Sequence, residues 1–132
     1  MTTPAPPTER ELEILKILWD LGEGSVREVY ERMRQAEAPI VQNTVQAFLR
    51  TMEDKGLVRH RTQGRTFVYR PVSGRDETEQ RLVSGVLDRV FDGAIDQLVQ
   101  SALSLRKPTA QELDRLEELL RRHKEQAQPK AK

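Results

Sequence analysis

The chain has 132 residues, of which 33% are charged and 36% hydrophobic, and this length holds one compact domain plus a smaller unit, not two full cores. It contains no cysteine, which excludes disulfides, thiolate catalysis and cysteine-built metal sites. The formal net charge of +1 gives no information about nucleic acid, because a whole-chain sum hides local concentrations of charge.

The two ends of the chain carry no targeting signal. Residues 1–7 are rich in proline and lack the basic start and apolar core of a signal peptide, and no window has the apolar length of a membrane span. We therefore expect a cytoplasmic protein without a membrane partner, with a flexible N-terminus at residues 1–7 and a flexible polar tail at residues 123–132.

The first two predicted helices each begin with a capping box, in which a hydroxyl residue is followed three positions later by glutamate. Thr8 and Glu11 precede a helix over Glu9–Leu21, which ends at the glycines that follow. Ser25 and Glu28 begin a shorter helix that fades before Pro39. The same signature recurs near the C-terminus, where Thr109 and Glu112 predict the start of the last helix.

A third helix is predicted after Pro39, with an apolar stripe that includes Val45, Leu49 and Met52. Its opposite face carries amide, hydroxyl and guanidinium groups, and no acidic residue occurs between Glu37 and Glu53. The candidate base-recognition residues on this helix are Gln42, Asn43, Thr44, Gln46 and Arg50, because amides pair with adenine and arginine with guanine in the major groove. The alternative is a solvated polar face, but such faces usually expose Glu and Lys.

A β-hairpin is predicted next, with strands at residues 57–62 and 65–70 joined through Gln63-Gly64. Six basic residues and no acidic residue lie between Asp54 and Asp76. We expect Arg61, Gly64 and Arg65 to contact phosphate or the minor groove. The alternative is an ordinary hairpin whose charges block aggregation. His60 is expected to pack or to be solvated, not to be catalytic.

The C-terminal part is predicted to be a separate helical unit. Residues 71–74 break the strand pattern, so the expected domains are a DNA-binding domain at residues 8–72 and a helical dimerisation domain at residues 76–122. Three short helices with few aromatic residues make a thin core, which a second copy of the chain would complete. The candidate interface residues are Leu82, Val86, Val90, Phe91, Leu98 and Leu116. The alternative is a satellite of a monomeric core.

Enzymatic function has no support in the sequence. It contains no glycine-rich phosphate loop, no paired metal ligands at helical spacing and no histidine near a nucleophile in a known motif, so no cofactor or metal is expected. Two other classes stay open. One is a winged-helix adaptor that binds an acidic protein, and the other is a ligand-sensing regulator, for which the thin C-terminal unit leaves little room for a pocket.

Several local strings, in this order and spacing, resemble the penicillinase-repressor family of the BlaI, MecI and CopY type. They lie at residues 8–15, 18–19, 25–29, 43–46 with Leu49, 55–58, 65–71, 87–93 and 109–120. The resemblance implies a mainly α fold: a winged helix-turn-helix domain of three helices and a hairpin, followed by a three-helix dimerisation region. It also implies a homodimeric repressor that binds double-stranded, palindromic operator DNA.

By position, the resemblance places Asn43, Thr44, Gln46 and Arg50 at the operator, and Arg61 and Arg65 on its backbone. In several relatives a membrane sensor triggers proteolysis at an Asn-Phe bond, so a regulatory protease or sensor is a further implied partner. Ser101-Ala102 stands at the corresponding positions here, which departs from that cleavage site. Copper-responsive relatives use paired cysteines near the C-terminus, and this chain has none.

Overall fold

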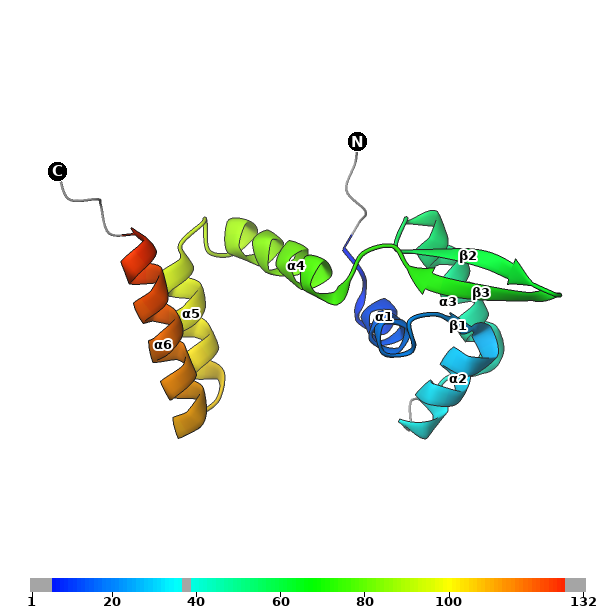
Figure 1. The fold of residues 1–132 in the computed structure, drawn as a ribbon, viewed down its shortest axis with the longest axis horizontal. Helices are drawn as coiled ribbons and strands as arrows, with labels where there is room; N and C mark the ends of the chain where they lie inside the picture. The colour runs from blue at the N-terminus through cyan, green and yellow to red at the C-terminus, as the bar shows by residue number, and fades with distance from the viewer. Residues whose placement is uncertain (1–5, 37–38, 128–132) are drawn as a thin grey trace. The chain divides into compact units, whose positions relative to one another are not determined.

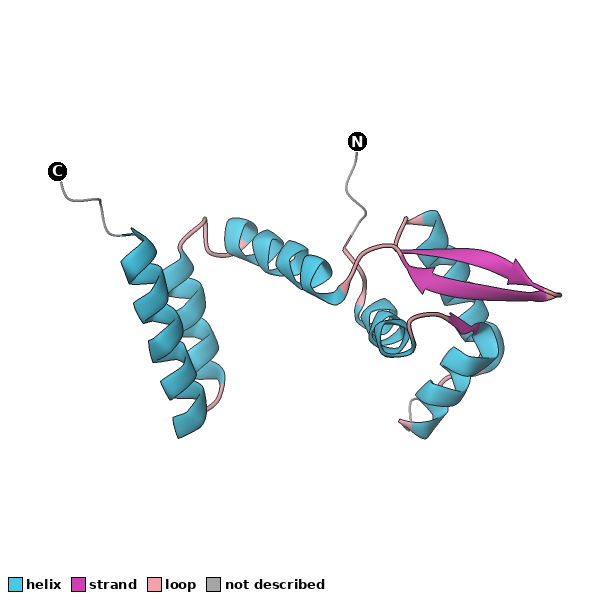
Figure 2. Ribbon diagram, viewed as in Figure 1, coloured by secondary structure: helices cyan, strands magenta, loops and turns pink. Residues whose placement is uncertain are grey.

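The computed structural model describes residues 6–36 and 39–127, and over these residues the fold is mainly helical with one small antiparallel sheet (Figures 1 and 2). Its elements in chain order are α1 (Glu9–Leu21), β1 (Gly24–Ser25), α2 (Val26–Gln35), α3 (Gln42–Asp54), β2 (Val58–Gln63), β3 (Thr66–Pro71), α4 (Arg75–Arg89), α5 (Ile95–Leu105) and α6 (Ala110–Ala127). Three helices followed by a hairpin are the elements of a winged helix-turn-helix, in the order that the sequence predicts.

The three predicted capping boxes are confirmed. At α1 the Thr8 hydroxyl accepts from the Glu11 N–H at 3.3 Å, and the Glu11 carboxylate accepts from the Thr8 N–H at 2.9 Å. The equivalent reciprocal bonds join Ser25 and Glu28 at α2, and Thr109 and Glu112 at α6. Each pair satisfies backbone N–H groups that a helix start leaves free.

The hydrophobic core lies in the N-terminal unit, where α1, α2, α3 and the sheet each contribute one apolar face. This core consists of Ile14, Leu15, Leu18, Val29, Met33, Val45, Leu49, Met52, Leu57, Val58 and Tyr69. Because α3 buries its apolar stripe here, its polar side is turned outward. The core therefore fixes which face of α3 is available to a partner.

The sheet has the strand order β1-β3-β2, and both pairs are antiparallel. β1 has two residues, and the sequence gives no strand signal of that length. Each hairpin strand begins and ends one residue later than predicted, because Gln63 pairs with Thr66 and leaves Gly64 and Arg65 as the loop. Gly64 has φ +63°. A positive φ at the first loop position is typical of a type II′ turn, which favours glycine there.

The chain divides into two compact units at a point inside α4, with residues 1–85 in the first unit and residues 86–132 in the second. This division lies beyond the predicted boundary at residues 71–74. The start of α4 belongs to the first unit because the Trp19 indole N–H donates to the Ser73 carbonyl at 2.9 Å, and the Arg75 guanidinium lies 5.3 Å from the centre of the Trp19 ring. Thr78, one turn further on, is buried.

The second unit contains the α5–α6 helical hairpin, preceded by a loop at Asp92 and Gly93, both with positive φ. Neither α5 nor α6 has a buried residue. α6 extends to Ala127, so residues 123–127 are helical where the sequence predicts a flexible tail. Ion pairs of Arg121 with Glu118 and with Glu125 stabilise these last turns. Residues 1–5 and 128–132, where most of the other predicted flexible residues fall, lie outside the described residues.

Two further classes of feature were searched for in residues 6–36 and 39–127. None of the helices there combines the length and the apolar character that crossing a membrane requires. In the same residues no three histidine, aspartate or glutamate side chains are grouped so that they could hold a metal ion.

Candidate nucleic-acid interface

Helix α3 presents one fully buried face and one fully polar face. Val45, Leu49 and Met52 have no exposed surface, and they hold the helix against α1, α2 and the hairpin. On the opposite side lie the predicted recognition residues Gln42, Asn43, Thr44, Gln46 and Arg50, all exposed. The structure thus brings the predicted residues of α3 together on one surface of the N-terminal unit.

The side chains on this polar face are not engaged elsewhere. Within the described residues, those of Gln42, Asn43, Gln46 and Arg50 form no hydrogen bond or ion pair. Their donors and acceptors are therefore directed to solvent or to a partner. Because amide and guanidinium groups can form paired hydrogen bonds with base edges, this face has the chemistry of major-groove recognition.

The N-terminus of α3 is also open to an anion. Its N-cap is Val41, which provides no side-chain hydrogen bond, and the first turn contains no acidic residue. The N–H groups of a first turn and the helix dipole favour negative charge at this end. Together with the acid-free face, this makes the start of α3 compatible with a phosphate backbone.

The C-terminus of α3 is anchored by a buried ion pair. Lys55, the C-cap residue, donates to both carboxylate oxygens of Glu11 at 2.9 Å, and Glu11 is 2% exposed. Burial alone would raise the pKa of Glu11, but the hydrogen bonds from Thr8 and Lys55 and the charge of Lys55 lower it below its usual value. The pair thus joins the start of α1 to the end of the predicted recognition helix.

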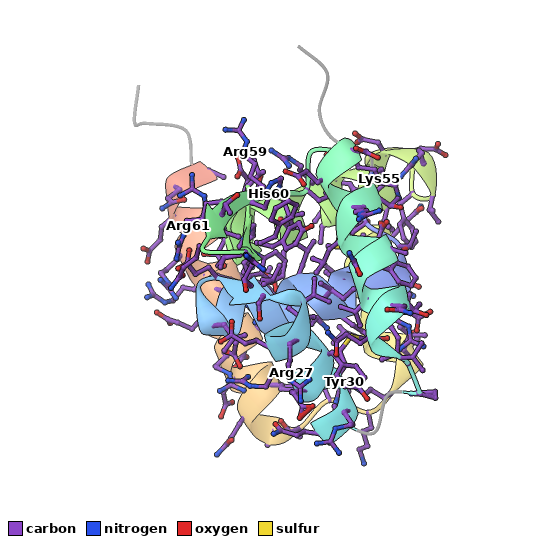
Figure 3. The ribbon with its side chains drawn as sticks, turned by 90° about the vertical axis from the view of Figure 1, so that its right-hand side faces the viewer. Arg27, Tyr30, Lys55, Arg59, His60 and Arg61 are labelled. Carbon is purple, nitrogen blue, oxygen red and sulfur yellow. The ribbon has the colours of Figure 1, made fainter. Side chains whose placement is uncertain are left out.

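The hairpin has two chemically distinct faces, which follow from its strand register. On the inner face, Val58 and Tyr69 belong to the core, and His60 lies directly opposite Tyr69. On the outer face, Arg59 lies opposite Arg70, and Arg61 lies opposite Val68 (Figure 3). Because cross-strand partners share a face, three arginines gather on the side of the sheet that does not face α3.

His60 connects the inner face of the hairpin to α3. Its Nδ1 atom lies 2.8 Å from both carboxylate oxygens of Glu53, and its ring stacks on Phe67 with the ring centroids 4.0 Å apart. These contacts place His60 in a packing role, as predicted. They also hold the hairpin beside the C-terminal half of α3.

Arg61, predicted to contact DNA, forms a two-point ion pair with Glu23 in the turn after α1. Arg61 Nη2 lies 2.6 Å from Glu23 Oε2, and Arg61 Nε lies 3.2 Å from Glu23 Oε1. The hydrogen bond from Arg61 lowers the pKa of Glu23, as do the charges of Arg61 and Arg70, and burial opposes them only in part. Arg65, also predicted to contact DNA, is exposed at the hairpin tip next to Gly64.

The predicted interface residues of the C-terminal part are not all in one unit. Leu82 lies in the first unit, whereas Val86, Val90, Phe91, Leu98 and Leu116 lie in the second. Val86 and Val90 are 43% and 66% exposed. Leu98 and Leu116 line a groove of about 460 Å³ between α5 and α6. The second unit therefore carries most of these residues on its surface.

Four residues of the interface region have roles that the sequence does not predict: Glu23, Glu53, Arg59 and Arg70. The two glutamates are found only through their partners in the folded chain. The signal for the two arginines is present in the strand alternation, because Arg59 shares a face with Arg61. Their gathering with Arg70 depends on the hairpin register, which the one-residue shift of the loop determines.

Comparison with known proteins identifies relatives over most of the chain. A sequence model described as penicillinase repressor matches residues 7–122. The penicillinase repressor of Bacillus licheniformis is 25% identical over 119 residues, which cover 89% of this chain and 91% of that protein. The solution structure of the DNA-binding domain of the repressor BlaI matches with a TM-score of 0.51 and 26% identity, over 58% of this chain and 93% of that chain. These matches confirm the resemblance and the mainly α, winged-helix fold class, and the chain belongs to the penicillinase repressor family.

Proposed function

We propose that this chain is a non-enzymatic transcriptional repressor that binds double-stranded operator DNA, with α3 in the major groove and the hairpin as a wing on the adjacent backbone. The observation that carries the proposal is the polar face of α3, whose exposed side chains have no partner within the described residues. The family membership and the likeness to the BlaI DNA-binding domain support it.

The recognition residues divide into two groups by their expected roles. Gln42, Asn43, Gln46 and Arg50 on α3 would contact base edges, and Thr44 and the wing residues Gly64 and Arg65 would contact the backbone. Arg61 belongs to the backbone group once it is released from Glu23. Base contacts determine which sequence is bound, whereas backbone contacts add affinity for any duplex.

Selection of bound duplexes from a random pool at near-physiological salt tests the proposal. Enrichment of an inverted repeat is the expected result, and the absence of any enriched sequence would contradict specific recognition. On the enriched duplex, Arg50→Ala should cost about 1–3 kcal/mol and relax the preference at one base pair. Arg65→Ala is the matched control, because it should weaken specific and random duplexes alike and reduce the salt slope by about 1.

We further propose that the chain acts as a homodimer joined through its C-terminal unit. Neither α5 nor α6 has a buried residue, yet both carry apolar side chains at helical spacing, including Ile95, Leu113 and Leu120. Such helices need a partner surface to bury these side chains. A two-fold dimer would also place two copies of α3 on symmetric half-sites, which matches a palindromic operator.

The oligomeric state is tested by charging Val90, the most exposed of the predicted interface residues on α4. Val90→Asp should convert the dimer into a monomer in sedimentation at micromolar concentration. Val72→Asp is the matched control, because Val72 is an exposed valine of the N-terminal unit and should leave the dimer intact. A wild-type protein that sediments as a monomer would contradict the dimer.

Release from DNA is proposed to follow a signal-dependent event that breaks the dimer, such as proteolysis. Ser101 and Ala102 lie within α5 and are exposed, and Ala102 lines the groove against α6. Cleavage there would separate most of α5 from α6. The expected result is a lower operator affinity after cleavage, measured with the purified fragments at equal concentration, and unchanged affinity would contradict this mode of release.

A further inference from the structure

The outer face of the wing carries more positive charge than the fold requires. We define this outer face by Arg59, Arg61, Val68 and Arg70, which alternate with the core-facing residues of β2 and β3. Arg59 and Arg70 lie directly opposite each other, an arrangement of like charges that destabilises an antiparallel pair. Within the described residues, neither forms an ion pair with a carboxylate. A cost of this kind is explained by an external anion.

Val68 shows how the outer face is built. It is 8% exposed although it does not belong to the core cluster. Its neighbours on this face include Arg61 directly opposite, and the aliphatic stems of arginines can cover an apolar side chain while their guanidinium groups stay in water. The stems thus lie along the sheet and leave the charged ends available at its surface.

Glu23 is the one carboxylate that contacts this cluster within the described residues. Its two oxygens accept from Nε and Nη2 of Arg61, and it also interacts with the charge of Arg70. Carboxylates and phosphates bind the same two-point donor pattern of a guanidinium group. Glu23 therefore takes the place on Arg61 that a backbone phosphate would take.

We propose that the outer face of the wing binds the phosphate backbone of DNA that flanks the half-site, and that Glu23 is an internal competitor for this site. This inference rests on the proposed function. The inner face of the wing is occupied by the contact of His60 with Glu53 of α3, so backbone between α3 and the wing meets that side. The outer face points the other way, toward duplex beyond the half-site.

The competitor is tested with Glu23→Gln in the full-length protein. It removes the charge but keeps the shape, so Arg61 should bind phosphate more readily and affinity should rise about two- to fivefold on operator and random duplexes alike, the range that exposed ion pairs contribute. In an Arg61→Ala background the same change should have no effect. An equal gain in both backgrounds would show general charge repulsion and overturn the proposal, and weaker binding by Glu23→Gln would show that Glu23 positions Arg61.

Glu118→Gln is the matched control. Glu118 forms an equivalent two-point pair with Arg121, at 2.7 and 3.0 Å, on an exposed part of α6. Its loss should leave DNA affinity unchanged. A gain equal to that of Glu23→Gln would mean that net charge alone sets the affinity, and would overturn the role of Glu23.

The position of the site is tested by duplex length. A duplex extended by about ten base pairs on each side should bind more tightly than one that ends at the half-sites, and Arg59→Ala or Arg70→Ala should remove much of this gain and lower the salt slope by about 0.9 for each phosphate lost. Equal losses on both lengths would overturn the flanking position. If the wild type binds no duplex, the proposed function fails. If it binds and these variants are neutral, only this inference fails.

Discussion

Replacing Lys55 by methionine removes the charge that balances the buried carboxylate of Glu11, while the apolar stem is retained. Breaking a buried pair by deleting one partner costs about 3–5 kcal/mol, because an uncompensated charge is left inside. Here Lys55 is 30% exposed and Glu11 keeps its bond from the Thr8 N–H, so we expect the lower figure of about 2 kcal/mol. Arg10→Met is the control, because the exposed Arg10–Glu13 pair on the same helix should contribute about 0.5 kcal/mol or less.

The measurement is urea unfolding of the full-length protein, followed by the fluorescence of Trp19, the one tryptophan of the chain, which lies in the N-terminal unit. Adding Glu11→Gln to Lys55→Met should restore stability or leave it unchanged, since it removes the unpaired charge. The same change in the wild type should destabilise. Equal costs of Glu11→Gln in the two backgrounds would refute the argument from charge pairing.

The cost of Lys55→Met should also depend on pH. The folded-state pKa of Glu11 is lowered, so the stability it contributes is present above the pKa of an unfolded glutamate, about 4.3, and is lost as the pH falls through the folded-state value. In Lys55→Met the carboxylate loses its cation and protonates at higher pH. The difference in unfolding free energy between wild type and variant should therefore narrow between pH 7 and pH 3, and a constant difference would contradict this origin.

Two further substitutions test the turn and the link to α4. Gly64→Ala should cost about 1 kcal/mol in urea unfolding, because its φ of +63° is strained for alanine although nothing lies within 4 Å of the added carbon; unchanged stability would mean that the turn does not need glycine. Trp19→Phe should cost about 1 kcal/mol in thermal unfolding followed by circular dichroism, since it removes the indole bond to the Ser73 carbonyl. A variant as stable as the wild type would show that this bond contributes nothing to the N-terminal unit.

Features that depend on local spacing were predictable from the sequence. The capping boxes at Thr8, Ser25 and Thr109 and the two-sided pattern of α3 arise from interactions over three or four residues, so the residues that form them are visible together in the chain. The helix order and the presence of a hairpin follow from the same signals. The family resemblance rests on the spacing of these local strings.

Features that depend on distant residues were not predictable. Glu11 and Lys55 are 44 positions apart, and Glu23 and Arg61 are 38 apart, so each pair exists only once α1 has packed against α3 or the hairpin. The two residues of β1 form a strand only because β3 offers them a partner. The end of the N-terminal unit is also set by tertiary contacts, since Trp19 binds Ser73 beyond the last strand.

The lack of buried side chains in α5 and α6 makes the amount of protein a variable of its structure. If a second copy supplies the missing interior, the stability of this unit rises with the concentration of the chain, as for any folding reaction that includes association. Dilution would then loosen the C-terminal helices while the N-terminal core, complete within one copy, stays folded. The number of molecules in a cell, and not only a signal, would determine whether a functional repressor exists.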